Sequence, residues 1–170
     1  MGFNRDFQGK KPRQLNRRSS QLPNWVLPGK LAIGSLPEPG DSALLKDAGI
    51  TAVVSLCAPS EGKLPEDVIQ AFRCLRFILP DSSFVLGIQP QDLVTVLEVI
   101  NEQIQQGEAV YVHCLAGVER SPTVCTAYLC LYEKLELWEA VSQVKKVHPY
   151  ALPTEDQLRV IRYLLVDHEE

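Results

Sequence analysis

The spacing of apolar residues changes along the chain in a way that predicts strands alternating with helices. Residues 50–57 form an almost continuous apolar run rich in β-branched side chains, which is typical of a strand buried on both faces. Residues 89–105 instead carry apolar side chains three and four positions apart, which is the stripe of a helix. That stripe consists of Leu93, Val96, Leu97, Ile100 and Ile104.

The other elements follow from the same pattern and from residues that start or stop helices. Asp41 is a suitable cap for a short helix that ends at Gly49. Because strands alternate with helices, we expect an α/β fold with a mostly parallel central sheet flanked by helices, and ligands at the carboxyl edge of that sheet. The expected strands are 25–27, 31–33, 50–57, 75–79 and 110–114, and the expected helices are 42–48, 65–72, 89–105, 121–133, 137–147 and 154–166.

One segment carries candidate chemistry. Residues 113–121 read His-Cys-Leu-Ala-Gly-Val-Glu-Arg-Ser and lie between an expected strand and an apolar helix. A helix that begins near Arg120 leaves unpaired N–H groups and a partial positive charge at its N-terminus, where oxyanions bind. Gly117 permits the backbone torsions of a tight loop, and the planar guanidinium of Arg120 fits two phosphate oxygens. The segment therefore predicts a phosphate-binding cup.

Cys114 lies at the base of this predicted cup. The N–H dipoles there favour its thiolate form, which is a nucleophile in attack position toward a bound phosphoryl group. Ser121 can donate a hydrogen bond toward the sulfur and help the thiol to leave. His113 is expected to orient the loop by hydrogen bonds rather than to transfer protons. The alternative for Cys114 is a buried cysteine of the core, but His, Gly, Arg and Ser on the same loop favour the nucleophile.

The segment resembles the signature loop of the cysteine-based protein tyrosine phosphatases, His-Cys-x5-Arg-Ser/Thr, and above all that of their compact dual-specificity branch. The resemblance covers residues from about 24 to 166, although only 113–122 is highly specific. It implies a dual-specificity-phosphatase-like fold and metal-independent phosphomonoester hydrolysis on phosphoproteins through a phosphocysteine intermediate. It also implies that phosphate binds to Leu115, Ala116, Gly117, Val118, Glu119 and Arg120, with Cys114 as nucleophile.

Cleavage of a phosphate ester also needs a proton for the leaving oxygen. In the resembled family, an aspartate on a mobile loop upstream of the cysteine supplies it. Asp81 follows an apolar run and Pro80, and its distance along the chain, 114 − 81 = 33 residues, leaves room for one helix and one strand. The resemblance therefore implies that Asp81 is the general acid. Asp81 as a simple turn former is the alternative, and Asp92 is a competing acid that the helix dipole already explains.

Cys57 ends an expected strand that runs parallel to the strand before Cys114. In some relatives a cysteine at this place, in a Leu-Cys sequence, forms a disulfide with the nucleophile. Such a partner protects a reactive thiol from irreversible oxidation. Cys57 is therefore a candidate redox partner of Cys114, although a plain core cysteine carries more weight.

Composition and cysteine usage limit the class of protein. The 170 residues are 45% hydrophobic, which suits a single domain with a sizeable core. The sequence shows neither a secretory signal nor an apolar stretch of the roughly 18 residues that would suggest a membrane span. Five cysteines, an odd number, argue for a reducing compartment, and we expect a cytoplasmic protein. No cysteine–histidine spacing indicates a zinc site, so no metal or cofactor is expected.

The charge is distributed unevenly. Residues 1–20 carry +5 and the whole chain −4, so residues 21–170 carry −4 − 5 = −9. We expect a basic tail over residues 1–23 and the phosphatase domain over 24–170. The tail is interpreted as a solvated leader. A nucleic-acid partner is not expected, although the positive charge of the tail is compatible with one. Its charged residues are Arg5, Asp6, Lys10, Lys11, Arg13, Arg17 and Arg18.

The sequence constrains the identity of the substrate less than it constrains the reaction. No obvious inserted phosphotyrosine-recognition loop is present, so a shallow cleft should accept phosphoserine and phosphothreonine as well as phosphotyrosine. Glu119 next to Arg120 opposes a highly anionic inositol lipid. The alternatives are a non-catalytic phosphopeptide-binding module, a phosphatase of RNA 5′ ends and a sulfur-transfer enzyme. The presence of both Cys114 and Asp81 favours a phosphoprotein phosphatase.

Overall fold

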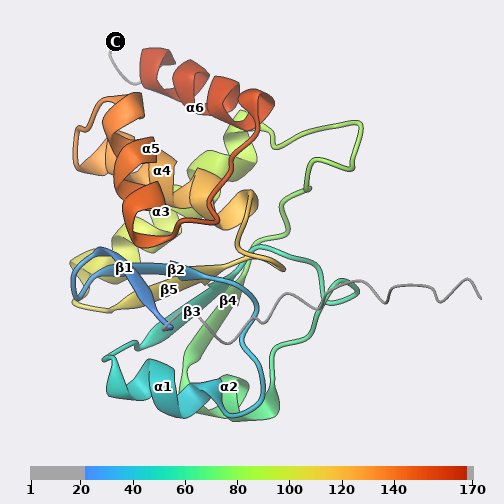
Figure 1. Ribbon diagram of the computed structural model, residues 1–170, viewed down its shortest axis with the longest axis vertical. Helices are drawn as coiled ribbons and strands as arrows, with labels where there is room; N and C mark the ends of the chain where they lie inside the picture. Colours follow the sequence, from blue (N-terminus) through green and yellow to red (C-terminus); the bar gives the residue numbers. More distant parts are fainter. Residues whose placement is uncertain (1–21, 168–170) are drawn as a thin grey trace, which may run out of the picture.

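The computed structural model describes residues 22–167, in which five strands form one sheet between two layers of helices (Figure 1). The predicted α/β class with a mostly parallel sheet is confirmed. The predicted basic tail lies outside the described residues, apart from Leu22 and Pro23. The strands are β1 (Asn24–Leu27), β2 (Leu31–Gly34), β3 (Ala52–Ser55), β4 (Arg73–Arg76) and β5 (Val110–His113), and the helices are α1 (Asp41–Asp47), α2 (Glu66–Ala71), α3 (Pro90–Gln105), α4 (Arg120–Tyr132), α5 (Leu137–Val147) and α6 (Glu155–Asp167).

Strand β5 lies at the centre of the sheet, whose order is β1-β2-β5-β3-β4. Strands β2, β5, β3 and β4 are parallel, and β1 joins β2 as an antiparallel edge strand. In this register His113 is the partner of Gly34 on one side and of Ser55 on the other. The carboxyl ends of three strands therefore meet where Cys114 follows β5, at the edge where parallel sheets bind ligands.

The helices cover the two faces of the sheet unequally. Helices α1 and α2 lie on one face, and α3, α4, α5 and α6 lie on the other (Figure 1). Helix α4 is buried from Arg120 through Cys130, as expected for a helix that lies between the sheet and its neighbouring helices. Its N-terminus is therefore held firmly against the carboxyl end of β5.

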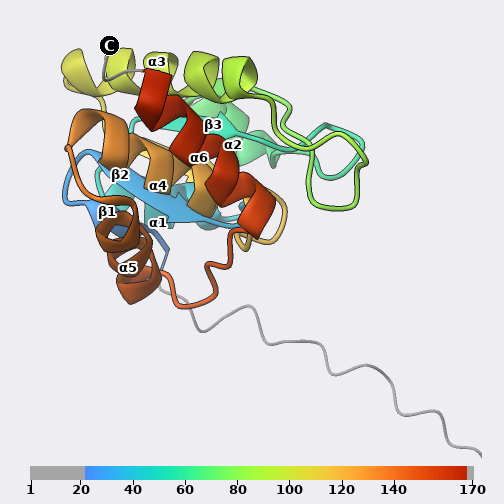
Figure 2. The same ribbon diagram turned by 90° about the horizontal axis from the view of Figure 1, so that it is seen from above.

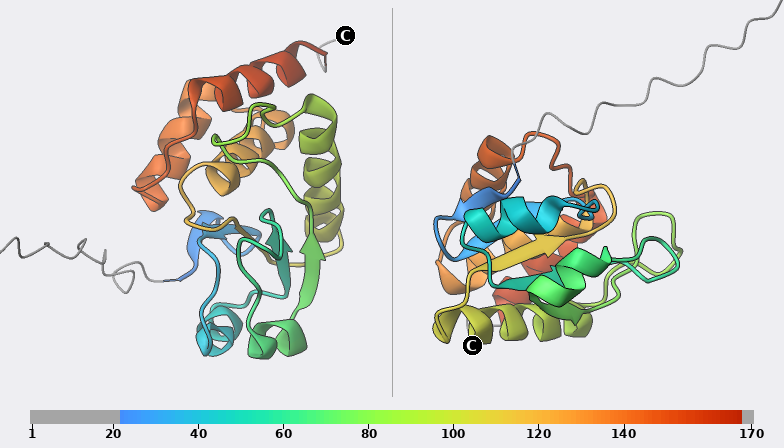
Figure 3. Two further views of the ribbon diagram at one scale, coloured as in Figure 1. Left: turned by 90° about the vertical axis from the view of Figure 1, so that its right-hand side faces the viewer. Right: turned by 90° about the horizontal axis from the view of Figure 1, so that it is seen from below.

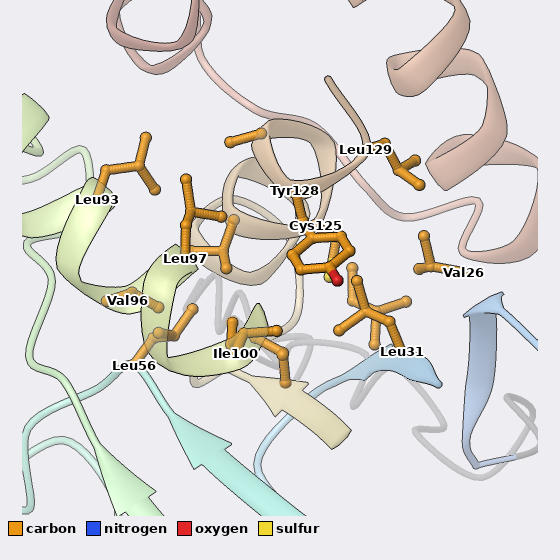
Figure 4. Close-up of a cluster of buried hydrophobic side chains, with 14 of the residues drawn as sticks. Val26, Leu31, Leu56, Leu93, Val96, Leu97, Ile100, Cys125, Tyr128 and Leu129 are labelled. Atoms are coloured by element: carbon orange, nitrogen blue, oxygen red, sulfur yellow. The ribbon is translucent and has the colours of Figure 1, made fainter. Parts of the chain in front are cut away.

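The predicted stripe on α3 forms part of the larger core cluster. Leu93, Val96, Leu97 and Ile100 lie among the side chains of the core in Figure 4 and are at most 1% exposed, whereas Ile104 is partly buried. Within residues 22–167, no helix is both long and apolar enough to cross a lipid bilayer. The labelled core side chains are Val26, Leu31, Leu56, Leu93, Val96, Leu97, Ile100, Cys125, Tyr128 and Leu129.

Strands β3 and β4 differ most from the prediction, whereas the bounds of the other three strands differ from it by one residue. Strand β3 covers only the middle of the apolar run 50–57, and β4 begins and ends earlier than the predicted 75–79. Strand β4 is an edge strand, so it tolerates Arg73 and Arg76. Because these residues are charged, the sequence lacks the apolar pattern that would indicate a strand there. Phe77, which the sequence placed in this strand, lies just beyond the end of β4 and still pairs with β3, because its N–H donates to Ser55 O at 2.9 Å.

The loops that follow β3 and β4 extend from the same edge of the sheet. Residues 56–65 and 77–89 both extend beyond the carboxyl ends of the strands (Figures 2 and 3). They lie next to the turn between β5 and α4, which contains the candidate nucleophile. The fold therefore assembles the predicted site from three loops that are distant in sequence.

Candidate active site

Cys114 lies at the base of a tight loop between β5 and α4. Its side chain is buried, and the Gly117 N–H donates to its sulfur at 3.3 Å. The Ser121 hydroxyl lies 3.4 Å from the same sulfur and 3.2 Å from Gly34 O, to which it donates. Ser121 has a single hydroxyl proton, so it can donate a hydrogen bond either to Gly34 O or to the thiolate of Cys114. The sulfur is thus surrounded by groups that stabilise negative charge.

Arg120 is the first residue of α4, and its buried guanidinium is held in a fixed plane. Its Nη1 donates to Glu61 Oε2 and to Leu79 O, each at 3.1 Å, and its Nη2 donates to Glu61 Oε1 at 2.8 Å. These bonds use three of the five N–H groups of the guanidinium. The two that remain, on Nε and Nη2, form one edge of the fork, which is the geometry that binds two phosphate oxygens.

Glu61 was not among the predicted site residues. Its carboxylate is held in the charged form, because the hydrogen bond from Arg120 lowers its pKa more than any other influence. Glu61 lies in the loop after β3, 59 positions before Arg120. No local pattern in the sequence pairs the two residues, since only the strand order brings their loops together.

The middle of the Cys114–Arg120 loop requires a glycine. Gly117 has a φ of +71°, and a Cβ there would lie 2.9 Å from Gly34 O and 3.1 Å from His148 Nε2. His148 Nε2 donates to Gly117 O at 2.8 Å, while Asn24 Nδ2 donates to His148 Nδ1, also at 2.8 Å. These partners define the neutral Nε2–H tautomer, and burial lowers the pKa of His148. His148 therefore holds the midpoint of the loop, a role absent from the sequence prediction.

His113 holds the start of the same loop. Its Nδ1 donates to Cys114 O at 2.8 Å, and the Ser55 hydroxyl donates to its Nε2 at 2.7 Å. Burial lowers the pKa of His113 to about 4, so the ring is neutral near neutral pH. Both ring nitrogens have structural partners, which supports the predicted orienting role.

Asp81 lines the same cavity as Cys114. A cavity of about 210 Å³ is lined by Cys114 and Arg120 on one side and by Asp81, Ser82 and Ser83 on the other. The Asp81 carboxylate accepts hydrogen bonds from the Ser83 N–H at 2.9 Å and from the Ser83 hydroxyl. These bonds are the main cause that lowers the pKa of Asp81, and Arg120 adds to it. The fold thus brings the predicted acid to the predicted cup.

Replacing Ser83 with alanine is expected to shift the alkaline limb of activity to higher pH. The hydroxyl stabilises the carboxylate form of Asp81, so its loss raises the pKa of that group toward the ordinary value. A general acid works only while it is protonated, so a higher pKa keeps it active at higher pH. The measurement is kcat/KM for phenyl phosphate across a pH series. A limb that stays in place, or that moves equally in Ser142→Ala on the exposed face of α5, would contradict the assignment.

Glu119 connects the cup to the loop that contains Asp81. Its carboxylate accepts hydrogen bonds from the Ser82 N–H at 3.1 Å and from the Ser82 hydroxyl at 2.8 Å. From the sequence, Glu119 was expected to belong to the phosphate loop and to oppose a highly anionic lipid by its charge. In the structure its side chain reaches the neighbouring loop, where it binds Ser82.

Cys57 is fully buried, two positions beyond the end of β3. Burial raises the pKa of its thiol, while the nearby charge of Arg120 opposes that rise. All five cysteines of the chain are unpaired. The role of Cys57 as a redox partner of Cys114 therefore stays a prediction.

Among residues 22–167, no group of His, Cys, Asp and Glu side chains is arranged to hold a metal ion.

A larger cavity of about 520 Å³ adjoins the catalytic one and shares Asp81 and Ser82 with it. It runs between the loop before α3 and the first turns of α6. Several of its walls are apolar and exposed to solvent, including Phe84 and Val85. A substrate held in the cup thus has an open, partly apolar groove beside Asp81.

Comparison with known proteins agrees with this geometry. Residues 35–164 match the family model of the dual specificity phosphatase catalytic domain. The chain is 27% identical over 131 residues to the phosphatidylglycerophosphate phosphatase PTPMT2 of Arabidopsis thaliana, covering 77% of this chain and 58% of that protein. It is 31% identical over 125 residues to human dual specificity protein phosphatase 2, covering 73% and 37%. The crystal structure of Tk-PTP in the active form is similar with a TM-score of 0.74 and 25% identity, covering 85% of this chain and 96% of that one.

The chain spans 58% and 39% of the length of the two Arabidopsis phosphatidylglycerophosphate phosphatases that it matches. The matched region contains the Glu61 loop, the Asp81 loop and the whole cup. Because the family model covers most of the chain, with Glu61, Asp81 and the whole cup, this protein belongs to the dual specificity phosphatase family, within the cysteine-based protein tyrosine phosphatase superfamily.

Proposed function

We propose that this protein hydrolyses phosphomonoesters on phosphoproteins, without a metal, through a phosphocysteine intermediate. The observation that carries the proposal is the shared cavity, which is lined by Cys114, Arg120 and Asp81 together. A nucleophile, a phosphate-binding cation and a proton donor are the three groups that this reaction requires.

The first step transfers the phosphoryl group to the enzyme. The phosphate oxygens bind to the loop N–H groups and to Arg120, and the Cys114 thiolate attacks phosphorus. A sulfur–phosphorus bond forms while the phosphorus–oxygen bond to the leaving group breaks. The leaving oxygen takes the proton of Asp81. Negative charge on the bound phosphoryl group raises the pKa of that carboxyl and so favours the protonated form.

The second step returns the enzyme to its starting state. A water molecule attacks the phosphorus of the phosphocysteine and gives its proton to the Asp81 carboxylate. The sulfur–phosphorus bond breaks, and the thiolate leaves with inorganic phosphate as the other product. The Ser121 hydroxyl, 3.4 Å from the sulfur, stabilises the departing thiolate. No further reactant is needed, because Asp81 regains the proton that it gave.

Two observations support a protein substrate over an anionic lipid. The similarity to a phosphatidylglycerophosphate phosphatase makes such a lipid the competing substrate. Residues 21–170 carry a net charge of −9, however, which opposes adsorption to an anionic membrane. The groove beside the cup also mixes apolar walls with Asp156 and Arg159, a composition suited to a polypeptide rather than to acyl chains. The unpaired cysteines further support a cytoplasmic setting.

A substrate panel tests this proposal. Initial rates are measured without metal for p-nitrophenyl phosphate, for peptides with phosphotyrosine or phosphothreonine, for phosphatidylglycerophosphate in micelles and for RNA with a 5′ phosphate group. We expect hydrolysis of p-nitrophenyl phosphate and of the peptides. A higher kcat/KM for the lipid or the RNA would replace the protein substrate. Binding of phosphopeptide without turnover of any compound would instead indicate a binding module.

Mild oxidation is expected to inactivate the enzyme reversibly if Cys57 is a redox partner. Hydrogen peroxide oxidises the Cys114 thiolate to a sulfenic acid, and the Cys57 thiol then displaces water to form a disulfide. Dithiothreitol should restore the wild type, whereas Cys57→Ser should lose activity irreversibly. Mass spectrometry of the oxidised protein measures the Cys57–Cys114 cross-link. Equal recovery of both proteins would show that Cys57 is only a core residue.

A further inference from the structure

Two side chains of the cup hold the loop that contains Asp81: Arg120 binds Leu79 O, two residues before the acid, and Glu119 binds Ser82, directly after it. Residues 81–87 make several hydrogen bonds, but those to Asp81 come from Ser83 and Phe84 within the same loop. Within the described part of the chain, the two bonds between Ser82 and Glu119 are the hydrogen bonds that connect residues 81–87 to another loop or helix. Arg120 thus holds the loop before the acid, and Glu119 holds it from Ser82 onward.

The two ends of this connection differ in rigidity. Glu119 immediately precedes α4, and its carbonyl accepts bonds from the N–H and the hydroxyl of Thr123, at 2.9 and 2.7 Å. The opposite end projects into solvent, because Phe84, Val85 and Leu86 are 61%, 103% and 76% exposed. An exposed loop with few packed side chains opens easily. The contact thus fixes the mobile partner to the rigid one.

We propose that Glu119 is a positioning residue that holds Asp81 over the cup by binding Ser82. The inference rests on the proposed function, since it assumes that Asp81 is the general acid. A general acid must lie within about 2.6–3.2 Å of the oxygen that it protonates. A displacement of about 1 Å costs on the order of 10²-fold in rate. Glu119 secures the residue next to Asp81, so its carboxylate sets how well proton transfer is aligned.

The negative charge of Glu119 also affects the substrate directly, and this effect can be distinguished from that of the contact with Ser82. A carboxylate next to Arg120 repels an anionic substrate, so its removal by charge alone would lower KM. Loss of the proposed contact instead lowers kcat, and most for esters whose leaving group needs a proton. The two effects therefore separate into KM and kcat. Phenyl phosphate needs the proton, whereas p-nitrophenyl phosphate releases a stabilised anion and needs it less.

Three substitutions at the contact are compared with a remote control. Glu119→Ala removes both bonds, Ser82→Ala removes only the hydroxyl bond, and Glu119→Gln keeps an oxygen that accepts one of them. We expect Glu119→Ala to lower kcat for phenyl phosphate about tenfold or more, and for p-nitrophenyl phosphate clearly less. The other two should give intermediate losses. Glu102→Ala, on an exposed position of α3, should match the wild type.

A double-mutant cycle with Asp81→Asn gives the decisive comparison. If Glu119 acts through the acid, Glu119→Ala should cause little further loss when Asp81 can no longer donate a proton. An equal loss for both esters, or an undiminished loss in the Asp81→Asn background, would overturn the positioning role while the phosphatase itself stands. Lack of wild-type activity toward either ester would overturn the proposed function, and this inference with it. If Glu119→Ala does not fold, Glu119→Gln and Ser82→Ala decide the question.

Discussion

Replacing Cys114 with serine is expected to abolish turnover and to leave phosphate binding intact. A serine hydroxyl is not ionised near neutral pH, so the nucleophile is lost although the side chain keeps its place. The guanidinium of Arg120 does not depend on the sulfur, because Glu61 and Leu79 O hold that side chain. Loss of a nucleophile in an enzyme that acts through a covalent intermediate lowers kcat by on the order of 10⁴-fold or more.

Two measurements check this expectation together. The kcat for p-nitrophenyl phosphate should fall below detection in Cys114→Ser, while calorimetry should still detect binding of a phosphotyrosine peptide. The matched control is Cys74→Ser, since Cys74 is half-buried on the edge strand β4, away from the cup. Substantial activity in Cys114→Ser would rule out a phosphocysteine intermediate. Loss of both activity and binding would assign the sulfur to the structure of the loop instead.

The parts of this site that could be predicted from the sequence are those formed by residues close together in the chain. The cup is built from one segment, so the order His113, Cys114, Gly117, Arg120 and Ser121 specifies it almost completely. A parallel strand followed by a helix places that segment at the edge of the sheet, with helix N–H groups directed at the ligand. Asp81 could be predicted as the acid because its spacing from Cys114 fits the resemblance to known phosphatases.

The parts that sequence reasoning missed depend on contacts between distant loops. Glu61 binds Arg120 across 59 positions, Glu119 binds Ser82 across 37, and His148 binds Gly117 O across 31. An acidic residue in a loop carries no sign of its partner, since surface loops are commonly acidic for other reasons. Strand β4 was misplaced for a related reason, because an edge strand accepts arginines that a central strand would exclude. Tertiary structure, rather than local pattern, decides each of these features.

Arg120→Lys is expected to lower kcat/KM by about 10²–10³-fold although the positive charge is kept. Glu61 and Leu79 O use three of the N–H groups of Arg120, and they orient the remaining edge as a pair of parallel donors. A lysine ammonium is a single point of charge, so it cannot bind the Glu61 carboxylate at two places and present a second pair of donors to phosphate. The charge alone would therefore attract the substrate without aligning it for attack.

The companion variant Glu61→Gln separates orientation from charge. The glutamine keeps the size of Glu61 and one accepting oxygen, but it loses the ion pair, so Arg120 should become less well oriented without losing any donor. We expect a loss smaller than that of Arg120→Lys, in the same kinetic parameter. The measurement is kcat/KM for p-nitrophenyl phosphate, with melting temperatures to establish that both variants fold. If Arg120→Lys retained nearly full activity, charge rather than geometry would stabilise the transition state. If Glu61→Gln had no effect while Arg120→Lys was severely impaired, phosphate binding alone would orient the guanidinium, and the Glu61 contact would belong only to the unliganded enzyme.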